Sequence, residues 1–219
     1  MKKFLIVILL LLVSLLSAGP SPAALNQEEK KAADELSAEE QNKRALESFQ
    51  TILELSESGD RQTVLPKLEA AYYHLISSYP KAQLTQEVYW RLIQIYMNEY
   101  RPPAFEKAEG LRSEFYKKYP DSRLGDLIDR ALADGYFKNS KWEKIVALFV
   151  PSIKQSIATG KFTRVYDIYM FTEAKFRLND LVEAEKGYKI IIANFPDSRE
   201  GKMAKKRLEE IEQKRQKQP

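Results

Sequence analysis

The feature that most constrains the fold of this chain is a short motif that occurs twice. Residues 119–125 read YPDSRLG, residues 195–201 read FPDSREG, and a related segment at residues 79–84 reads YPKAQL. The two full copies start 76 residues apart (195 minus 119), or two periods of about 38 residues, a length typical of stacked helical hairpins. We therefore expect a repeat protein in which one copy, in the middle of the chain, lacks the motif.

Apolar residues between these motifs recur every three or four positions, which is the period of amphipathic helices. Strand signals are nearly absent, and the segment KIIIANF at 189–195 continues a helical apolar face. Glycine and proline mark the boundaries, so each repeat is expected to be a helix, a turn and a returning helix. The expected pairs occupy residues 88–100 and 105–120, 126–138 and 142–149, and 165–178 and 181–196.

The N-terminal hairpin has a clear helix start. Ser37 followed by Glu40 is a capping box, in which each side chain accepts a hydrogen bond from a free backbone N–H. Ser-Gly-Asp at 58–60 ends this helix, and a second helix ends at Tyr79 because Pro80 cannot continue it. The apolar face of the first helix is expected to consist of Leu46, Phe49, Ile52 and Leu53.

Two segments, ALADGYFKNSKWEKI at 131–145 and TEAKFRLNDLVEAEKGY at 172–188, resemble tetratricopeptide repeats. The resemblance covers about residues 38–212 and implies an all-α fold, a right-handed superhelix of stacked antiparallel helical hairpins. The residues that match the pattern are Ala133, Tyr136, Phe137, Thr172 and Phe176 in first helices, and Ala108, Phe149, Ala184 and Tyr188 in second helices. In this alignment Pro120 and Pro196 each close a repeat, and Ser122 and Ser198 cap the helix that follows.

The third unit departs from the pattern. Ile157 stands where the closing proline belongs, and Lys175 stands where an aromatic residue is usual in the unit that follows. Pro151 is expected to kink or end the second helix of the third unit, because proline removes a helix hydrogen bond.

The first 23 residues have the layout of a secretory signal peptide. MKK is followed by an apolar run from Phe4 to Leu16 and then by SAGPSPAA, which suits cleavage after Ala23. A retained membrane anchor is the alternative. We expect residues 24–36 to be a polar linker, residues 37–212 to hold about four hairpins and a C-terminal capping helix, and residues 213–219 to be a basic tail.

Few residues can carry catalytic or metal chemistry. The chain has no Cys, which excludes disulfides and lipid attachment through cysteine, and its one His, His74, is expected to be a packing residue. Phosphate loops and zinc or calcium motifs are absent, so we expect no enzyme, no metal and no cofactor. Without Lys2 and Lys3 the charge is about +2 (33 basic and 31 acidic residues), with both signs interspersed, so no nucleic-acid partner is expected.

The resemblance also implies a binding surface, because the first helix of each tetratricopeptide hairpin lines a concave groove. The residues projected onto that face are Trp90, Gln94, Asn98, Arg130, Asp134, Lys138, Tyr169, Glu173 and Arg177. Trp90 and Tyr169 are expected to be exposed anchors for a bound peptide, whose register the charged residues would set. The alternative is that this face contacts only solvent. Basic and asparagine residues do not follow the pattern that clamps a C-terminal carboxylate.

The signal peptide followed by YPDS and FPDS repeats resembles two kinds of bacterial envelope protein. One is the lipoproteins that assist outer-membrane β-barrel assembly, and the other is the periplasmic factor that couples cell division to envelope constriction. We therefore expect a periplasmic or secreted adaptor that binds a protein or peptide and meets the membrane only through its signal segment or a partner. A structural or oligomerising element, the alternative, would need an exposed apolar seam on the N-terminal helix; the oligomeric state is left open.

Overall fold

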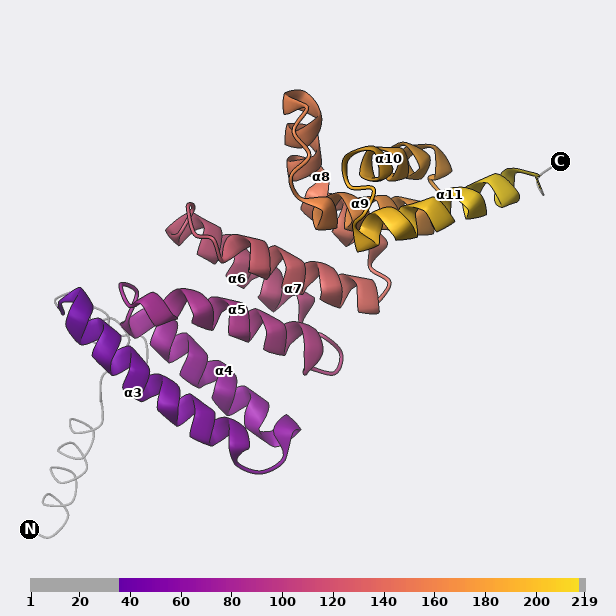
Figure 1. Ribbon diagram of the computed structural model, residues 1–219. Coiled ribbons are helices and arrows are strands. Elements are labelled where there is room, and N and C mark those ends of the chain that lie inside the picture. Colours follow the sequence, from indigo (N-terminus) through magenta and orange to yellow (C-terminus); the bar gives the residue numbers. More distant parts are fainter. Residues whose placement is uncertain (1–35, 217–219) are drawn as a thin grey trace, which may run out of the picture. The chain divides into compact units, whose positions relative to one another are not determined.

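The computed structural model describes residues 36–216, and these residues form helices without any strand (Figure 1). The all-α fold class expected from the apolar periodicity is therefore confirmed. The expected signal segment, most of the linker and the last three residues lie outside the described residues. The helices are α3 (Ala38–Glu57), α4 (Arg61–Ser78), α5 (Gln83–Asn98), α6 (Phe105–Lys118), α7 (Gly125–Lys138), α8 (Trp142–Thr159), α9 (Val165–Arg177), α10 (Leu181–Asn194) and α11 (Arg199–Gln216).

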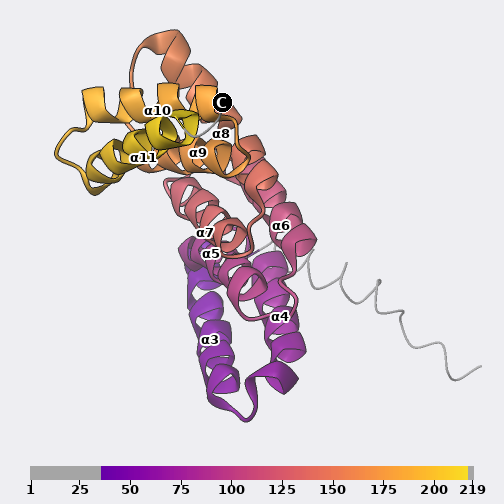
Figure 2. The same ribbon diagram turned by 90° about the vertical axis from the view of Figure 1, so that its right-hand side faces the viewer.

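The chain divides within α5, between Leu92 and Ile93, into two compact units. In the N-terminal unit α3 packs against α4. In the C-terminal unit α7 packs against α6 and α8, α9 packs against α8 and α10, and α11 packs against α10 and α9 (Figure 2). Two of the expected helix pairs, α7 with α8 and α9 with α10, are therefore in contact.

The start of α3 forms half of the expected capping box. Ser37 Oγ accepts a hydrogen bond from the Glu40 N–H at 3.2 Å. The Glu40 carboxylate instead accepts a 2.9 Å hydrogen bond from Arg44, one turn further along the helix. The turn to α4 is as expected, because Gly59 has a φ of 75° and Asp60 caps the next helix by accepting from the Thr63 N–H at 3.1 Å.

The prediction of which face of α3 is buried is wrong, because the helix is rotated about its axis relative to the predicted orientation. Ile52 is buried as expected, but Leu46 and Leu53 are 62% and 46% exposed, and the other buried residues are Ala45 and Gln41. A tertiary contact accounts for this rotation, because the buried Gln41 side chain accepts a 2.9 Å hydrogen bond from the Lys81 N–H. As a result the small residue Ala45 is buried, and Leu46, which was expected to be buried, is not.

The two copies of the opening motif end helices in the same way but start the next helix differently. Tyr119 and Phe195 are the C-caps of α6 and α10. Ser198 Oγ accepts from the Gly201 N–H at 2.9 Å and caps α11 as expected. Ser122 does not cap α7; its Oγ accepts from the Leu124 N–H at 3.2 Å in an extra turn before the helix starts.

The middle unit lacks the motif because α8 continues past the position where the motif would end it. Pro151 lies inside α8 and is exposed, and the helix extends to Thr159, so of the two expected effects of this proline the ending of the helix does not occur. Gly160, with a φ of 64°, ends the helix in the left-handed conformation that glycine adopts without strain.

Small residues allow close helix contacts in the C-terminal unit. The predicted packing positions Ala108, Ala133, Thr172 and Ala184 are fully buried, at 0% exposure. Helices α9 and α10 approach each other closely at Gly187, where a Cβ atom would lie 2.1 Å from the Thr172 Oγ1. Only glycine fits there, so this contact fixes how α10 lies on α9.

Candidate functional site

The clearest candidate site is a pocket of about 310 Å³ in the C-terminal unit, which we call the α7–α9–α11 pocket. Three of the predicted groove residues, Asp134, Lys138 and Tyr169, contribute to it. Side chains from three helices line it: Asp134, Phe137 and Lys138 of α7, Tyr166, Tyr169 and Met170 of α9, and Arg199, Glu200 and Met203 of α11. The first helices of two successive hairpins and the helix that follows therefore supply one concave surface.

Apolar side chains form the walls of the pocket and charged side chains form its rim. Tyr169 and Met170 are buried, and Phe137 and Met203 are half-buried. The charged residues Asp134, Lys138 and Arg199 are exposed. An apolar wall with a few polar groups at the rim is the usual composition of a site that binds another molecule.

Tyr166 links α7 and α9 at the edge of the pocket. Its hydroxyl donates a 2.6 Å hydrogen bond to Asp134 Oδ1, and the Arg130 guanidinium lies 4.5 Å from the centre of its ring. Burial, and the hydrogen bond to Asp134, raise the pKa of Tyr166 far above its ordinary value of 10.0, so the hydroxyl remains a donor at every physiological pH. Asp134 and Arg130 were both predicted as groove residues, and the structure brings them to the same aromatic ring.

Tyr169 does not have the exposure predicted for an anchor residue. It is only 8% exposed, and burial raises its pKa to about 12, with the neighbouring Glu173 carboxylate as a further cause. Its side chain forms part of the pocket wall because α11 packs over this part of α9. The sequence did not predict the burial of Tyr169, because α11 was expected to be only a terminal capping helix.

Glu173 is also buried, at 0% exposure, although it was predicted to face the groove. Its carboxylate is compensated by donors from three helices. Arg207 of α11 donates at 2.9 Å and 2.7 Å, Tyr188 of α10 donates at 2.8 Å, and Arg177 of α9 donates at 2.9 Å. Glu173 therefore holds α10 and α11 on α9 and belongs to the scaffold behind the pocket.

The remaining predicted groove residues lie in several places. Arg177 is exposed and its guanidinium lies 5.7 Å from the Trp142 ring centre, at the start of α8. Asn98 accepts a 2.8 Å hydrogen bond from Lys138, and both line a second pocket of about 410 Å³ at the C-terminal ends of α5 and α7. Gln94 and Trp90 are half-buried, and Trp90 belongs to the N-terminal unit.

Six pocket residues were missed as site residues by the sequence analysis: Phe137, Tyr166, Met170, Arg199, Glu200 and Met203. A signal for two of them was present, because Arg199 and Met203 are four residues apart and thus on one face of a helix. Treating residues 199–216 as a further first helix, and not as a cap, would have placed both in the groove.

A third pocket, of about 260 Å³, lies among α6, α7 and α8 and is lined largely by paired charges. Lys144 pairs with Glu109, and Arg112 pairs with Asp129 at 2.6 Å.

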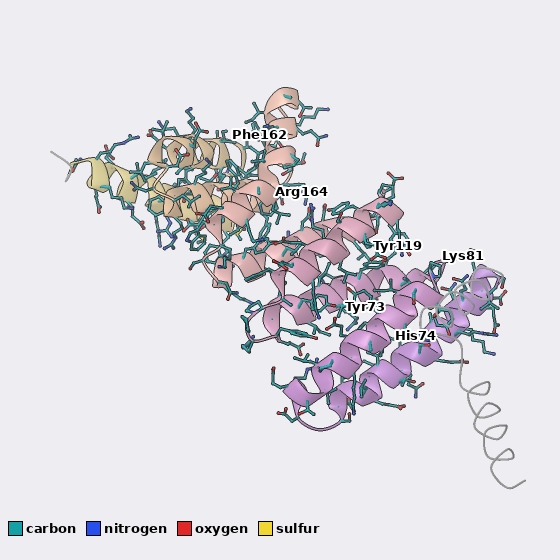
Figure 3. All side chains as sticks on the ribbon, turned by 180° about the vertical axis from the view of Figure 1, so that it is seen from behind. Tyr73, His74, Lys81, Tyr119, Phe162 and Arg164 are labelled. Carbon is teal, nitrogen blue, oxygen red and sulfur yellow. The ribbon has the colours of Figure 1, made fainter. Side chains whose placement is uncertain are left out.

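His74 is exposed rather than packed in the core (Figure 3). Within residues 36–216 no cluster of His, Asp or Glu is arranged to hold a metal ion, and none of the helices there is long and apolar enough to cross a membrane.

No protein-family model, curated protein or solved structure matches this chain. The evidence for a function therefore comes from the geometry and the residues themselves.

Proposed function

We propose that this chain is an exported adaptor of the bacterial cell envelope that binds a segment of a partner protein in the α7–α9–α11 pocket. The observation that carries the proposal is the pocket itself, a concave surface of aromatic and methionine side chains with a charged rim. It lies on the first helices of consecutive hairpins, where a tetratricopeptide-like superhelix would present its groove.

The chemistry of the wall suits a protein ligand. Aromatic rings provide large contact areas at a small loss of conformational freedom, and methionine adapts its shape to different apolar groups. Phe137, Tyr166 and Met203 are the half-buried members of this wall, so they have area left for a partner to cover. A volume of about 310 Å³ is at the lower end of the range for ligand pockets, which favours one or two anchoring side chains.

The location is proposed on the sequence of residues 1–23, which has the layout of a signal peptide. Assistance to outer-membrane β-barrel assembly and a role in envelope constriction are the two specific pathways that the sequence style suggests. The identity of a captured partner would distinguish them.

Site-specific photo-crosslinking in the native envelope tests the proposal. A photoreactive residue at position 203, in the pocket, should capture a specific partner protein that mass spectrometry identifies. The matched control is position 182 on α10, where Val182 is 59% exposed and lies outside the pocket. Equal capture at the two positions, or none at position 203, would show that the pocket is not the binding surface.

An oligomerising role is the second candidate, and one observation favours it. Leu46 and Leu53 lie seven residues apart on α3 and are both exposed, which is the apolar seam that this role requires.

A further inference from the structure

Two surfaces within residues 36–216 are exposed to solvent there and have complementary chemistry. One is the leucine stripe of α3, and the other is the α7–α9–α11 pocket. We infer that α3 of one copy docks into the α7–α9–α11 pocket of a second copy, so that the chain associates head to tail. This inference rests on the proposed function, since it names a partner for the same pocket.

Two carboxylates lie beside the leucine stripe of α3. Leu46 and Leu53 share one helix face, and Glu47 and Glu54 each follow a leucine directly along the chain. Neither glutamate forms an ion pair with a residue of the described part of the chain; Glu54 accepts only a hydrogen bond from Gln50. The stripe thus offers two apolar side chains flanked by unpaired negative charge.

The charged residues that line the pocket are two cations and two anions, and two lysines further along α11 add a basic excess beside it. Arg199 lines the pocket, and Lys202 and Lys206 follow it along α11 at helical spacing. Among the described residues none of these three cations has a carboxylate partner. Lys138, across the pocket on α7, is bonded to a neutral Asn98 oxygen. The rim therefore offers several cations to an acidic ligand, against the acidic pocket residues Asp134 and Glu200.

Both surfaces gain from the contact for the same physical reasons. Leucine side chains lose contact with water when they enter a wall of aromatic and methionine groups, at about 25 cal/mol per Å² of apolar area buried. Opposite charges at the rim direct the approach and set the register. A helix of 20 residues is about 30 Å long, so the contact is small for a stable interface. We therefore expect weak association, seen at micromolar to millimolar concentration.

The contact joins two different surfaces, so it is heterologous. In a pair, one copy keeps a free pocket and the other keeps a free α3 stripe, so the association can continue into a chain or close into a ring. Pairing of α3 with α3 would instead be isologous and would stop at a dimer. This difference makes the inference testable by mixing variants.

Sedimentation of the full chain at rising concentration is the first measurement. The average mass should rise with concentration, and high salt should oppose the rise. The L46Q/L53Q variant and the K202E/K206E variant should each need at least about tenfold higher concentration to associate, since loss of about 1.4 kcal/mol is a factor of ten. The matched control is Ile157→Gln, because Ile157 on α8 is as exposed as Leu46, at 62%, and should behave as wild type.

A mixture of the two double variants is the decisive measurement. One variant retains the pocket and the other retains the α3 stripe, so the mixture should form a heterodimer and nothing larger. No heterodimer, or an effect of Ile157→Gln equal to that of L46Q/L53Q, would overturn the inference. A wild-type chain that stays monomeric while position 203 still captures another protein would overturn the inference and leave the proposed function standing.

Discussion

Asp167, in the first turn of α9, is a buried carboxyl group whose ionised form is poorly compensated. The residue is 3% exposed. The Nε atom of Arg164, which Figure 3 labels, lies 2.9 Å from Asp167 Oδ2 and forms an ion pair with it. The same Oδ2 atom accepts no hydrogen bond of good geometry. Burial raises the pKa of Asp167 from an ordinary value of 3.8 to about 6, against the opposing effect of Arg164. Ionised Asp167 therefore destabilises the folded state relative to the protonated form.

The magnitude follows from the pKa. One pKa unit corresponds to about 1.4 kcal/mol, so a rise from 3.8 to about 6 corresponds to about 3 kcal/mol. Because the folded pKa is the higher one, this stability is fully present below about pH 4 and is lost as the pH rises through about 6. Asp167→Asn has no such loss, so at about pH 8 it should be more stable than wild type by up to about 3 kcal/mol.

Denaturant unfolding of both proteins at about pH 4 and about pH 8 measures this difference. The variant should gain on wild type between the two pH values and match it closely at the lower one. Asp126→Asn is the matched control, because Asp126 also pairs with Arg164, at 2.8 Å, but its side chain is 65% exposed. Its effect should stay within about 1 kcal/mol. An Asp167→Asn protein that is less stable at the higher pH, or whose advantage does not depend on pH, would refute the reasoning.

Three further substitutions test the packing. Tyr169→Ala should lower the free energy of unfolding by about 3–5 kcal/mol, measured by denaturant titration, because the ring is buried; a loss below 1 kcal/mol would contradict its place in the wall. Gly187→Ala should lower the melting temperature, since its Cβ would lie 2.1 Å from Thr172 Oγ1, and Thr172→Ala in the same chain should recover part of the loss. Glu173→Gln should cost about 3 kcal/mol and speed proteolysis of α11, because Arg207 loses a charged partner; unchanged proteolysis would contradict this.

The helices themselves could be predicted from the sequence because their signals are local. The segment 126–138 was expected to be a helix, and α7 spans Gly125–Lys138. Its apolar period and the turn at Asn139 and Ser140 are all contained within a few residues. The Ala108 and Ala184 contacts could be predicted for a similar reason, since small residues at repeat positions indicate where helices approach.

The orientation of each helix face could not be predicted in the same way. On α3 the sequence predicted that Leu46, Ile52 and Leu53 lie on one buried face, but the buried face holds Ala45 and Ile52 and leaves the two leucines exposed. The bond between Gln41 and the Lys81 N–H decides the orientation, and it joins residues 40 positions apart. A pattern within one helix holds no information about such a contact.

Glu173 shows how such a distant contact also changes the reading of a site residue. As an exposed groove residue it would contact a partner directly, but its bonds to Arg207 and Tyr188 make it a support for α11. Arg199 and Met203 of α11 form one side of the pocket, so loss of Glu173 would act on binding by moving that wall. Lys138, by contrast, is exposed at the rim and would affect binding without a loss of stability. Binding and stability should therefore change together at Glu173 and separately at Lys138.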